Sequence, residues 1–307
     1  MKILLTGGAG YIGSVLVPHL LSMGFKVIVV DNFMYHQTSL LDYCWDKDLT
    51  VIRGDVRDGC LMNEQIRKVD VILPFASLIG ASRWANDPIG AKTINLDAIK
   101  MILDYRSQDQ ILIYPGINFI YGAAKDDICT EETPLNPVSF YAHKKVEIEN
   151  LILSEQNCIS LRLPSIFGTS PKMQFHPLVN DFTYRAVTDH FIVLFEAHYK
   201  RSYLHVRDVA RAFIHAIIHF DKMKNQAYNV GLNEYHTKWE LCEEIKKQVP
   251  NFFFVEENHV RDPEQRSYIV SNAKIEATGF QPIISLREGI AELIKGYQII
   301  RNTQFDV

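Results

Sequence analysis

Residues 2–14, KILLTGGAGYIGS, open the chain and decide its fold. The apolar run 2–6 predicts a short buried strand, and the glycines that follow it predict a tight turn. From Tyr11 to Met23 the apolar residues recur with helical spacing. We therefore expect a strand, a glycine-rich turn and a helix at the start of the chain.

The glycines of this turn have the spacing of a phosphate-binding loop. Gly7, Gly10 and Gly13 form a G-x-x-G-x-x-G pattern, and the glycines at 8, 10 and 13 form G-x-G-x-x-G. Such a loop needs positive φ, close approach of the backbone to a pyrophosphate and close packing of the helix on the strand. The helix start offers its unpaired N–H groups to the phosphates. The turn, with Tyr11 and Ile12, therefore predicts a dinucleotide site.

A carboxylate at the end of the second predicted strand indicates which dinucleotide binds. The strand 26–31 ends in Asp31, a residue suited to accept hydrogen bonds from both adenosine ribose hydroxyls. Asp31 would repel a 2′-phosphate, and the next residues, Asn32 and Phe33, include no arginine to pair with one. We therefore expect NAD rather than NADP.

The first half of the chain alternates apolar strands with amphipathic helices. This alternation predicts an α/β fold with a doubly wound parallel sheet, in which ligands bind beyond the carboxyl ends of the strands. The predicted strands are 2–6, 26–31, 50–53, 69–74, 110–114 and 158–163, and the predicted helices are 11–23, 61–68, 91–105 and 139–155.

The pattern loosens after about residue 164, where prolines and aromatic residues stand in irregular segments. Helices are expected at 206–219, 238–248 and 286–300, with short strands at 227–230 and 252–255. We predict a cofactor domain of residues 1–165 plus about 204–231. A smaller mixed α/β substrate lobe of 166–203 and 232–307 would form a cleft with it.

Tyr141 and Lys145 lie four residues apart in a predicted helix and therefore share one face. A tyrosine hydroxyl has a pKa of about 10 in water, and a neighbouring ammonium stabilises its ionised form. Such a phenolate can take the proton of a substrate alcohol while hydride passes to a nicotinamide. The lysine can also bond the nicotinamide ribose. We predict that this pair is catalytic.

Composition excludes several other classes of function. The 307 residues are 47% hydrophobic and 22% charged, with a formal net charge of -4, which argues against nucleic acid or an anionic membrane as the main partner. The five cysteines form no metal-ligand pattern, so we expect no metal and a reducing compartment. We see no signal peptide or membrane-spanning run and expect a cytoplasmic protein.

Beyond these features, the chain resembles the extended short-chain dehydrogenase/reductase family, specifically its nucleotide-sugar epimerases and dehydratases. The landmarks in order are TGGAGYIGS at 6–14, GDVRD at 54–58, PFAS at 74–77, Asn95, YG at 121–122, Tyr141 with Lys145, LRLPSIFG at 161–168, RSYLHVRDV at 201–209, YNVG at 228–231 and SNAKIEATGFQP at 271–282. Within the family it most resembles the GDP-heptose 4-dehydrogenases of bacterial capsule synthesis, through segments 113–118 and 179–186.

The resemblance implies a Rossmann fold, a nucleotide-sugar substrate and roles for individual residues. Asp55 and Val56 would hold the adenine, and Ala76 and Ser77 would line the path of the pyrophosphate and nicotinamide ribose. Asn32, Asn95 and Pro164 complete the expected cofactor contacts. The expected substrate contacts are Asn118, Asn180, and the arginines Arg201 and Arg261, whose guanidinium forks suit a diphosphate. Family members often dimerise through the helices at 91–105 and 139–155, so we expect a homodimer.

The chain departs from the family in the segment before Tyr121. Family members have Ser or Thr at the position of Ile117, and the dehydratases follow it with Asp and Glu, where this chain has Asn118 and Phe119. Dehydration is therefore disfavoured. Oxidation or reduction at a sugar carbon, C4 by expectation, remains, with 4-epimerisation as the alternative. A second alternative is an NAD-binding protein with little catalysis, because a positioned acid–base partner typically supplies about 10²–10⁴-fold in rate.

Overall fold

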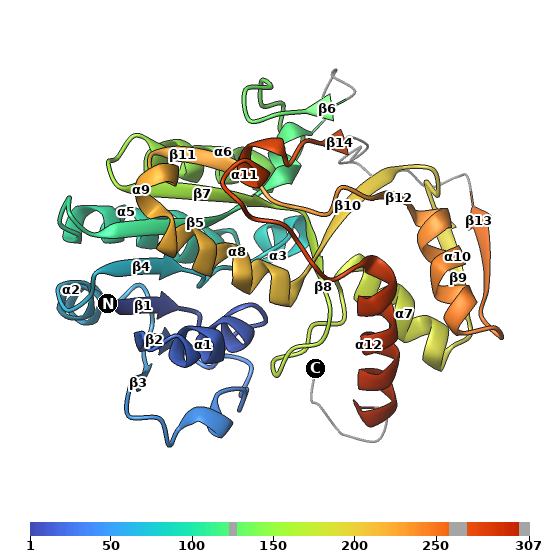
Figure 1. The fold of residues 1–307 in the computed structure, drawn as a ribbon, viewed down its shortest axis with the longest axis horizontal. Coiled ribbons are helices and arrows are strands. Elements are labelled where there is room, and N and C mark those ends of the chain that lie inside the picture. Colours follow the sequence, from blue (N-terminus) through green and yellow to red (C-terminus); the bar gives the residue numbers. More distant parts are fainter. Residues whose placement is uncertain (123–127, 258–268, 301–307) are drawn as a thin grey trace.

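A seven-stranded parallel sheet forms the centre of the computed structural model, which describes residues 1–122, 128–257 and 269–300 (Figure 1). The strand order reverses between β1 and β4, which places a crevice at the carboxyl ends of these strands. This confirms the doubly wound Rossmann fold. In spatial order the strands are β3 (Leu49–Arg53), β2 (Lys26–Asp31), β1 (Lys2–Thr6), β4 (Val71–Pro74), β5 (Ile111–Ile117), β7 (Cys158–Leu163) and β11 (Gln226–Asn229).

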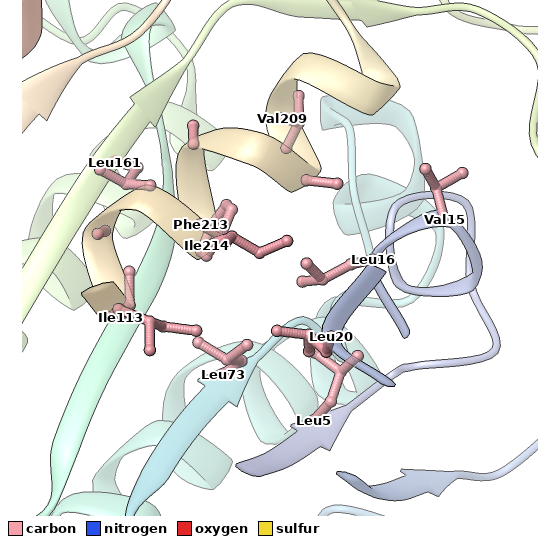
Figure 2. Close-up of a cluster of buried hydrophobic side chains, with 14 of the residues drawn as sticks. Leu5, Val15, Leu16, Leu20, Leu73, Ile113, Leu161, Val209, Phe213 and Ile214 are labelled. Carbon is pink, nitrogen blue, oxygen red and sulfur yellow. The ribbon is translucent and has the colours of Figure 1, made fainter. Parts of the chain in front are cut away.

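Both faces of the sheet are buried, which explains why its strands are continuous apolar runs. Ile3 and Leu5 of β1 pack on one face against α1 (Gly13–Ser22) and α8 (Val206–Ile218) (Figure 2). Leu4 points to the other face. That second face is covered by α2 (Gly59–Ile66), α5 (Ala98–Tyr105) and α6 (Phe140–Leu153).

The single helix predicted at 91–105 is divided in the structure. It comprises α4 (Pro88–Lys92), a wider π-helical turn at Thr93–Asp97 (η2) and α5. The Thr93 hydroxyl donates to the Ile89 carbonyl at 2.9 Å, a side-chain bond of the kind that distorts helices. The prediction of one regular helix was wrong, because an apolar period near four residues does not distinguish α from π turns.

The segment predicted as irregular after residue 164 contains regular elements. These are β8 (Ser165–Phe167), α7 (Leu178–Thr188), β9 (Phe191–Phe195) and β10 (Lys200–His205). The sequence of α7, LVNDFTYRAVT, is rich in weak helix formers, so propensity gives no signal for it. Packing against α12 (Leu286–Ile300) and α10 (Lys238–Gln248) stabilises it instead.

Smaller sheets accompany these helices in the second part of the chain. The strand β10 pairs in parallel with β8 and antiparallel with β12 (Tyr235–Thr237), and β9 pairs with β13 (Phe253–Glu257). None of the helices in the described ranges is both long enough and apolar enough to cross a membrane. The remaining elements are η1 (Leu41–Tyr43), α3 (Ala81–Asn86), η3 (Asn118–Tyr121), β6 (Ile128–Cys129), α9 (Phe220–Met223), β14 (Ile269–Val270) and α11 (Ala273–Glu276).

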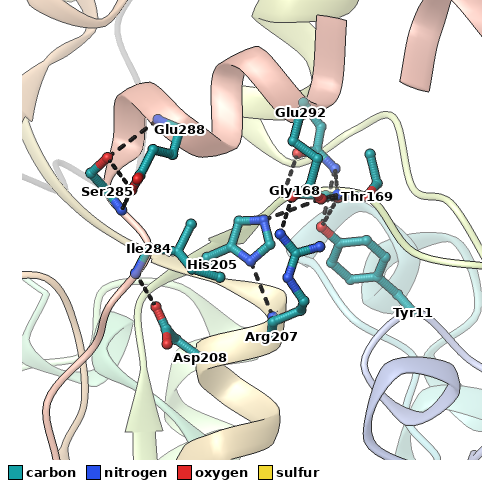
Figure 3. A network of polar contacts seen from close by, with 11 residues as sticks. Tyr11, Gly168, Thr169, His205, Arg207, Asp208, Ile284, Ser285, Glu288 and Glu292 are labelled. Atoms are coloured by element: carbon teal, nitrogen blue, oxygen red, sulfur yellow. Dashed lines mark hydrogen bonds and ion pairs between the residues drawn. The ribbon is translucent and has the colours of Figure 1, made fainter. Parts of the chain in front are cut away.

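A polar network ties α12 to the glycine-rich turn (Figure 3). Glu292 of α12 accepts a hydrogen bond from the Thr169 N–H at 3.0 Å, and the fully buried His205 approaches the same carboxylate at 3.4 Å. Beside it, the Tyr11 hydroxyl donates to the Gly168 carbonyl at 2.7 Å. The network therefore holds the 168–169 turn, and through it Tyr11, in a fixed position.

Glu292→Gln is expected to destabilise the protein. Burial alone raises the pKa of Glu292, but the contact with His205 and the hydrogen bonds from Thr169 outweigh it and hold the pKa at about 2, below the ordinary 4.5. Because the pKa of Glu292 is lower in the folded state than in the unfolded chain, its ionised carboxylate stabilises the fold above about pH 4.5. This stabilisation is lost as the pH falls toward about 2. Because Glu292 is partly exposed, we expect a loss of about 2 kcal/mol in the free energy of unfolding, measured with denaturant at neutral pH. Glu243→Gln, on the exposed face of α10, is the control; equal losses for both variants would refute the role of the network.

Candidate active site

A cavity of about 910 Å³ opens beyond the carboxyl ends of the central strands. Its wall is formed by the segments that follow β1, β2, β3, β4 and β5 and by the junction between β7 and β8. This volume is at the upper end of the range of small-molecule sites. The cavity is therefore large enough for a ligand that extends along the whole edge of the sheet.

The glycine-rich turn forms the floor of this cavity through Gly7, Gly10, Tyr11, Ile12 and Gly13. Gly7 has φ +69°, and a Cβ there would lie 2.7 Å from the Ala76 nitrogen, so only glycine fits. A Cβ on Gly13 would lie 2.6 Å from the Gly8 Cα, so glycine at this position allows the turn to pack this closely.

The start of α1 fits the diphosphate of a dinucleotide. Ile12, the residue that precedes α1, provides no side-chain cap, and the first turn of the helix has no acidic residue. Ile12 and Gly13, at this helix start, line the cavity, where no carboxylate of the first turn competes with an anionic ligand. The partial positive charge of the helix start is available to an anionic ligand.

Asp31 ends β2 with its carboxylate at the cavity wall. It accepts from the Ala9 N–H at 3.0 Å and from the Phe33 N–H at 2.8 Å, and burial raises its pKa. Gln37 donates to the same carboxylate at 3.2 Å. These bonds link the glycine-rich turn to the loop after β2 and fix the orientation of the carboxylate at the cavity wall.

Seven further residues predicted to contact the cofactor are placed by the structure in two groups. Asn32, Asp55, Val56, Ala76, Ser77 and Pro164 all line the cavity. Asn95 does not: it is 3% exposed and stands behind Ser77, whose hydroxyl it contacts, while its amide donates to the Ala91 carbonyl at 2.8 Å. Asn95 therefore positions the Ser77 loop.

Tyr141 and Lys145 lie one turn apart on α6, and both line the cavity. The Lys145 ammonium is 6.0 Å from the centre of the Tyr141 ring, and its Nζ donates to the Tyr114 hydroxyl at 3.0 Å. Burial lowers the pKa of Lys145 from 10.5 to about 8. The ammonium is therefore close to its titration point near neutral pH.

An apolar wall stands where a hydroxyl was expected beside this pair. Ile117 and Phe119 line the cavity. Ile117 packs against a buried cluster that contains Tyr141, Leu78 and Trp84. The reactive end of the cavity thus contains a phenol and an ammonium against a largely hydrophobic surface.

The residues predicted to bind substrate do not all meet in the cavity. Arg201 lines it from β10 and is 8% exposed. Asn118 is buried and is not part of the wall. Asn180 is fully buried and holds the 168–174 loop, with its side chain bonded to Gly168 N at 3.0 Å and to Gln174 O at 2.8 Å. Arg261 lies outside the described residues.

Sequence reasoning missed several polar residues of the cavity wall. Arg83 of α3, His176 in the loop before α7 and Lys238 at the start of α10 line it, as does Tyr35 after β2. No local motif marks these positions, since they converge from distant segments. Within the described ranges, no group of three or more His, Cys, Asp or Glu residues is arranged to hold a metal ion.

Comparison with known proteins identifies the family. The model of the NAD dependent epimerase/dehydratase family matches residues 3–231. A dTDP-glucose 4,6-dehydratase of Streptomyces niveus is 25% identical over 97% of this chain and 93% of its own length. A putative UDP-glucose 4-epimerase of Methanocaldococcus jannaschii is also 25% identical, over 95% and 97%.

A solved structure shares the fold over nearly its full length. The UDP-glucose 4-epimerase of Thermus thermophilus, in complex with NAD, is 24% identical and superposes with a TM-score of 0.82 over 97% of this chain and 99% of its own. The chain therefore belongs to the NAD-dependent epimerase/dehydratase family, of the extended short-chain dehydrogenase/reductase type, and its cofactor is NAD.

Proposed function

We propose that the protein oxidises or reduces C4 of a nucleotide-activated sugar with NAD. The observation that carries this proposal is the position of Tyr141 and Lys145, which share one cavity with the glycine-rich turn and Arg201. One cavity therefore contains groups for the cofactor, an acid–base pair and a cation for a diphosphate. NAD and a nucleotide sugar bound side by side could reach all of them.

In the direction of oxidation, Tyr141 takes the proton of the C4 hydroxyl as the general base. Lys145 stabilises the phenolate by its charge and bonds the nicotinamide ribose. NAD, when bound, accepts the hydride. Ile117 and Phe119 exclude water from the reacting carbon, and the polar lining residues orient the sugar.

The charges on the cavity wall support a nucleotide-sugar substrate. Asp31 and Asp55 line the end assigned to the adenosine. The remainder is lined by the cationic side chains Arg83, Arg201 and Lys238, together with one carboxylate, Asp181. A diphosphate linking a nucleoside to a sugar matches such a surface. Two relatives, a dTDP-glucose 4,6-dehydratase and a putative UDP-glucose 4-epimerase, are named for nucleotide sugars.

The wall around Ile117 disfavours elimination of water. A dehydratase needs an acid and a base near the leaving hydroxyl, but Phe119 lines the cavity and Asn118 is buried outside it. We therefore favour simple C4 oxidation or reduction over dehydration, with 4-epimerisation as the alternative. GDP-heptose, a precursor of capsule polysaccharide, is the substrate that we would test first.

The experiment is incubation of the holoprotein with GDP-heptose and a panel of GDP-, UDP-, CDP- and dTDP-sugars. We expect one sugar to yield a 4-keto product or a C4 epimer, identified by mass spectrometry and NMR. A product that has lost water would instead assign dehydration. The absence of any product and of any change in cofactor absorbance across the panel would refute the proposal.

Ile117 supports a second candidate, an NAD-binding protein with little catalysis. Its apolar side chain takes the place of the hydroxyl expected next to Tyr141, which removes one partner for the substrate oxygen. The same panel separates the two candidates when binding is measured beside turnover. Tight binding of a nucleotide sugar without turnover would favour this second function.

Asp31→Asn is expected to weaken the preference for NAD over NADP. The amide retains one acceptor for the ribose but removes the charge that repels a 2′-phosphate. We expect titration calorimetry to show an approximately tenfold loss of NAD affinity and a gain in NADP affinity. Asp42→Asn, at an exposed position in η1, is the control. Unchanged discrimination would show that Asp31 does not contact the ribose.

We also propose that the protein forms a homodimer through α5 and α6. These helices pack side by side on one face of the sheet. Tyr105 and Phe140, at the ends of the two helices, expose apolar surface. Light scattering after size-exclusion chromatography would give the mass of a dimer, and a monomer mass would refute the proposal.

A further inference from the structure

A second buried tyrosine lies directly beneath the catalytic pair. Tyr114 belongs to β5, is 3% exposed and packs in the core between the sheet and α5 and α6. Its hydroxyl accepts a hydrogen bond from Lys145 Nζ at 3.0 Å, and the ammonium is 5.2 Å from the centre of its ring. Lys145 is thus held between Tyr114 on the sheet side and Tyr141 on the cavity side.

The other buried charges near Lys145 are occupied elsewhere. Glu149 follows Lys145 by one turn of α6 and is 1% exposed. Its carboxylate accepts from Arg162 at 2.7 and 3.0 Å and from the Ser160 hydroxyl at 2.6 Å. In the described part of the chain no carboxylate pairs with Lys145, so the hydroxyl of Tyr114 is the acceptor that the fold gives to this ammonium.

The backbone of β5 is adapted to this arrangement. A Cβ on Gly116 would lie 2.6 Å from the Ser160 Oγ and 3.1 Å from a Glu149 carboxylate oxygen, so glycine leaves room for the network. Tyr114 and Gly116 stand on the same strand as Ile117. The strand that lacks a hydroxyl at the cavity wall therefore provides one beneath it.

We propose that Tyr114 is a positioning residue for the catalytic pair: its hydroxyl holds the Lys145 ammonium charged and directed at Tyr141. The proposal rests on the proposed oxidoreductase function. A buried ammonium is costly without an acceptor, and a hydrogen bond to its charged form offsets part of that cost. Tyr114 itself touches neither the cavity nor the reacting atoms.

Other titratable groups around Lys145 remain the same when Tyr114 is changed. Tyr141 and Glu149 face it from α6, Arg162 lies behind Glu149 on β7, and Tyr121 of η3 accepts from Arg162 at 2.7 Å. On the elements packed against α6, the side chains of Arg83, Lys92, Lys100 and Asp104 are exposed, and Asp97 pairs with Lys92 at 2.8 Å.

The test is Tyr114→Phe, which retains the ring and removes the acceptor. The variant should lower the pKa of Lys145 below its value of about 8, because the charged form loses its hydrogen bond. NAD affinity, measured by calorimetry across pH, should therefore begin to fall about one pH unit lower than in the wild type. The alkaline limb of the rate profile should move in the same direction. At neutral pH the lost charge alone should lower kcat about twofold, and the lost orientation of the ammonium toward Tyr141 should bring the fall to about tenfold, with KM changed less than about twofold.

Tyr203→Phe is the matched control. Tyr203 is fully buried in β10, and its hydroxyl has no hydrogen-bond partner in the described part of the chain, so its removal should leave both pH profiles in place. A fall in kcat with unmoved NAD-affinity and rate profiles would reduce Tyr114 to a packing role and overturn the proposal. The NAD-affinity profile needs no sugar substrate, so it still decides the role of Tyr114 if no nucleotide sugar is turned over.

Discussion

Tyr141→Phe is expected to lower kcat by about 10³-fold while the protein still folds and binds NAD. A positioned general base contributes about 10²–10⁴-fold, and the variant removes only the hydroxyl. The ring remains to pack against Trp84, whose ring centre is 6.0 Å away. Calorimetry should therefore show NAD affinity within a few-fold of the wild type, while steady-state assays on the active nucleotide sugar show the loss.

Tyr43→Phe is the control for this variant, because Tyr43 is partly exposed in η1 and does not line the cavity. Its turnover should equal that of the wild type. If Tyr141→Phe retained kcat within about tenfold, another group would have to take the substrate proton. Tyr35, a phenol elsewhere on the cavity wall, would be the next residue to test.

Lys145→Met is expected to remove activity and to stabilise the cofactor-free protein. The folded state lowers the pKa of Lys145 from 10.5 to about 8 because the ammonium is buried. The unfolded chain therefore binds more protons between these values, so this group destabilises the fold below about pH 8, and its penalty fades as the pH rises toward 10.5. An uncharged side chain of similar length avoids that penalty.

The free energy of unfolding, measured with denaturant at neutral pH, is expected to rise by about 2 kcal/mol. The pKa shift of Lys145 corresponds to about 3 kcal/mol, and the loss of the hydrogen bond to Tyr114 offsets part of it. The same variant should lose at least about 10²-fold in kcat/KM. Lys144→Met is the control: Lys144 is partly exposed and pairs with Glu147 at 2.7 Å, so its effect on stability should stay within about 0.5 kcal/mol. A destabilised Lys145→Met would contradict the inferred cost of the buried ammonium.

A loss of activity together with a gain in stability in Lys145→Met would show that the charged lysine needed for catalysis destabilises the fold. A charged lysine beneath a hydrophobic wall is unfavourable for folding, but it is the state that supports a phenolate at Tyr141. The hydroxyl of Tyr114 reduces this conflict without abolishing it. The low pKa of Lys145 also implies that NAD affinity should fall above about pH 8.

Local patterns in the sequence were sufficient for the cofactor half of the protein. The predicted strands 2–6, 26–31 and 158–163 coincide with β1, β2 and β7, because strands buried on both faces are continuous apolar runs. The glycine-rich turn and Asp31 are recognised from residue types at short spacing, because the turn depends on local backbone geometry. The sequence alone therefore predicted NAD as the cofactor.

The rest of the site depends on tertiary packing. The helix α7 has weak intrinsic propensity and depends on packing against α10 and α12. Asn118 and Asn180 have the polarity of ligand residues, but burial removes both from the cavity wall. Tyr114 has no motif, and its role follows from a contact between β5 and α6 across 31 positions. Spacing within one element is determined by the periodicity of strands and helices, whereas convergence of distant side chains depends on how those elements pack.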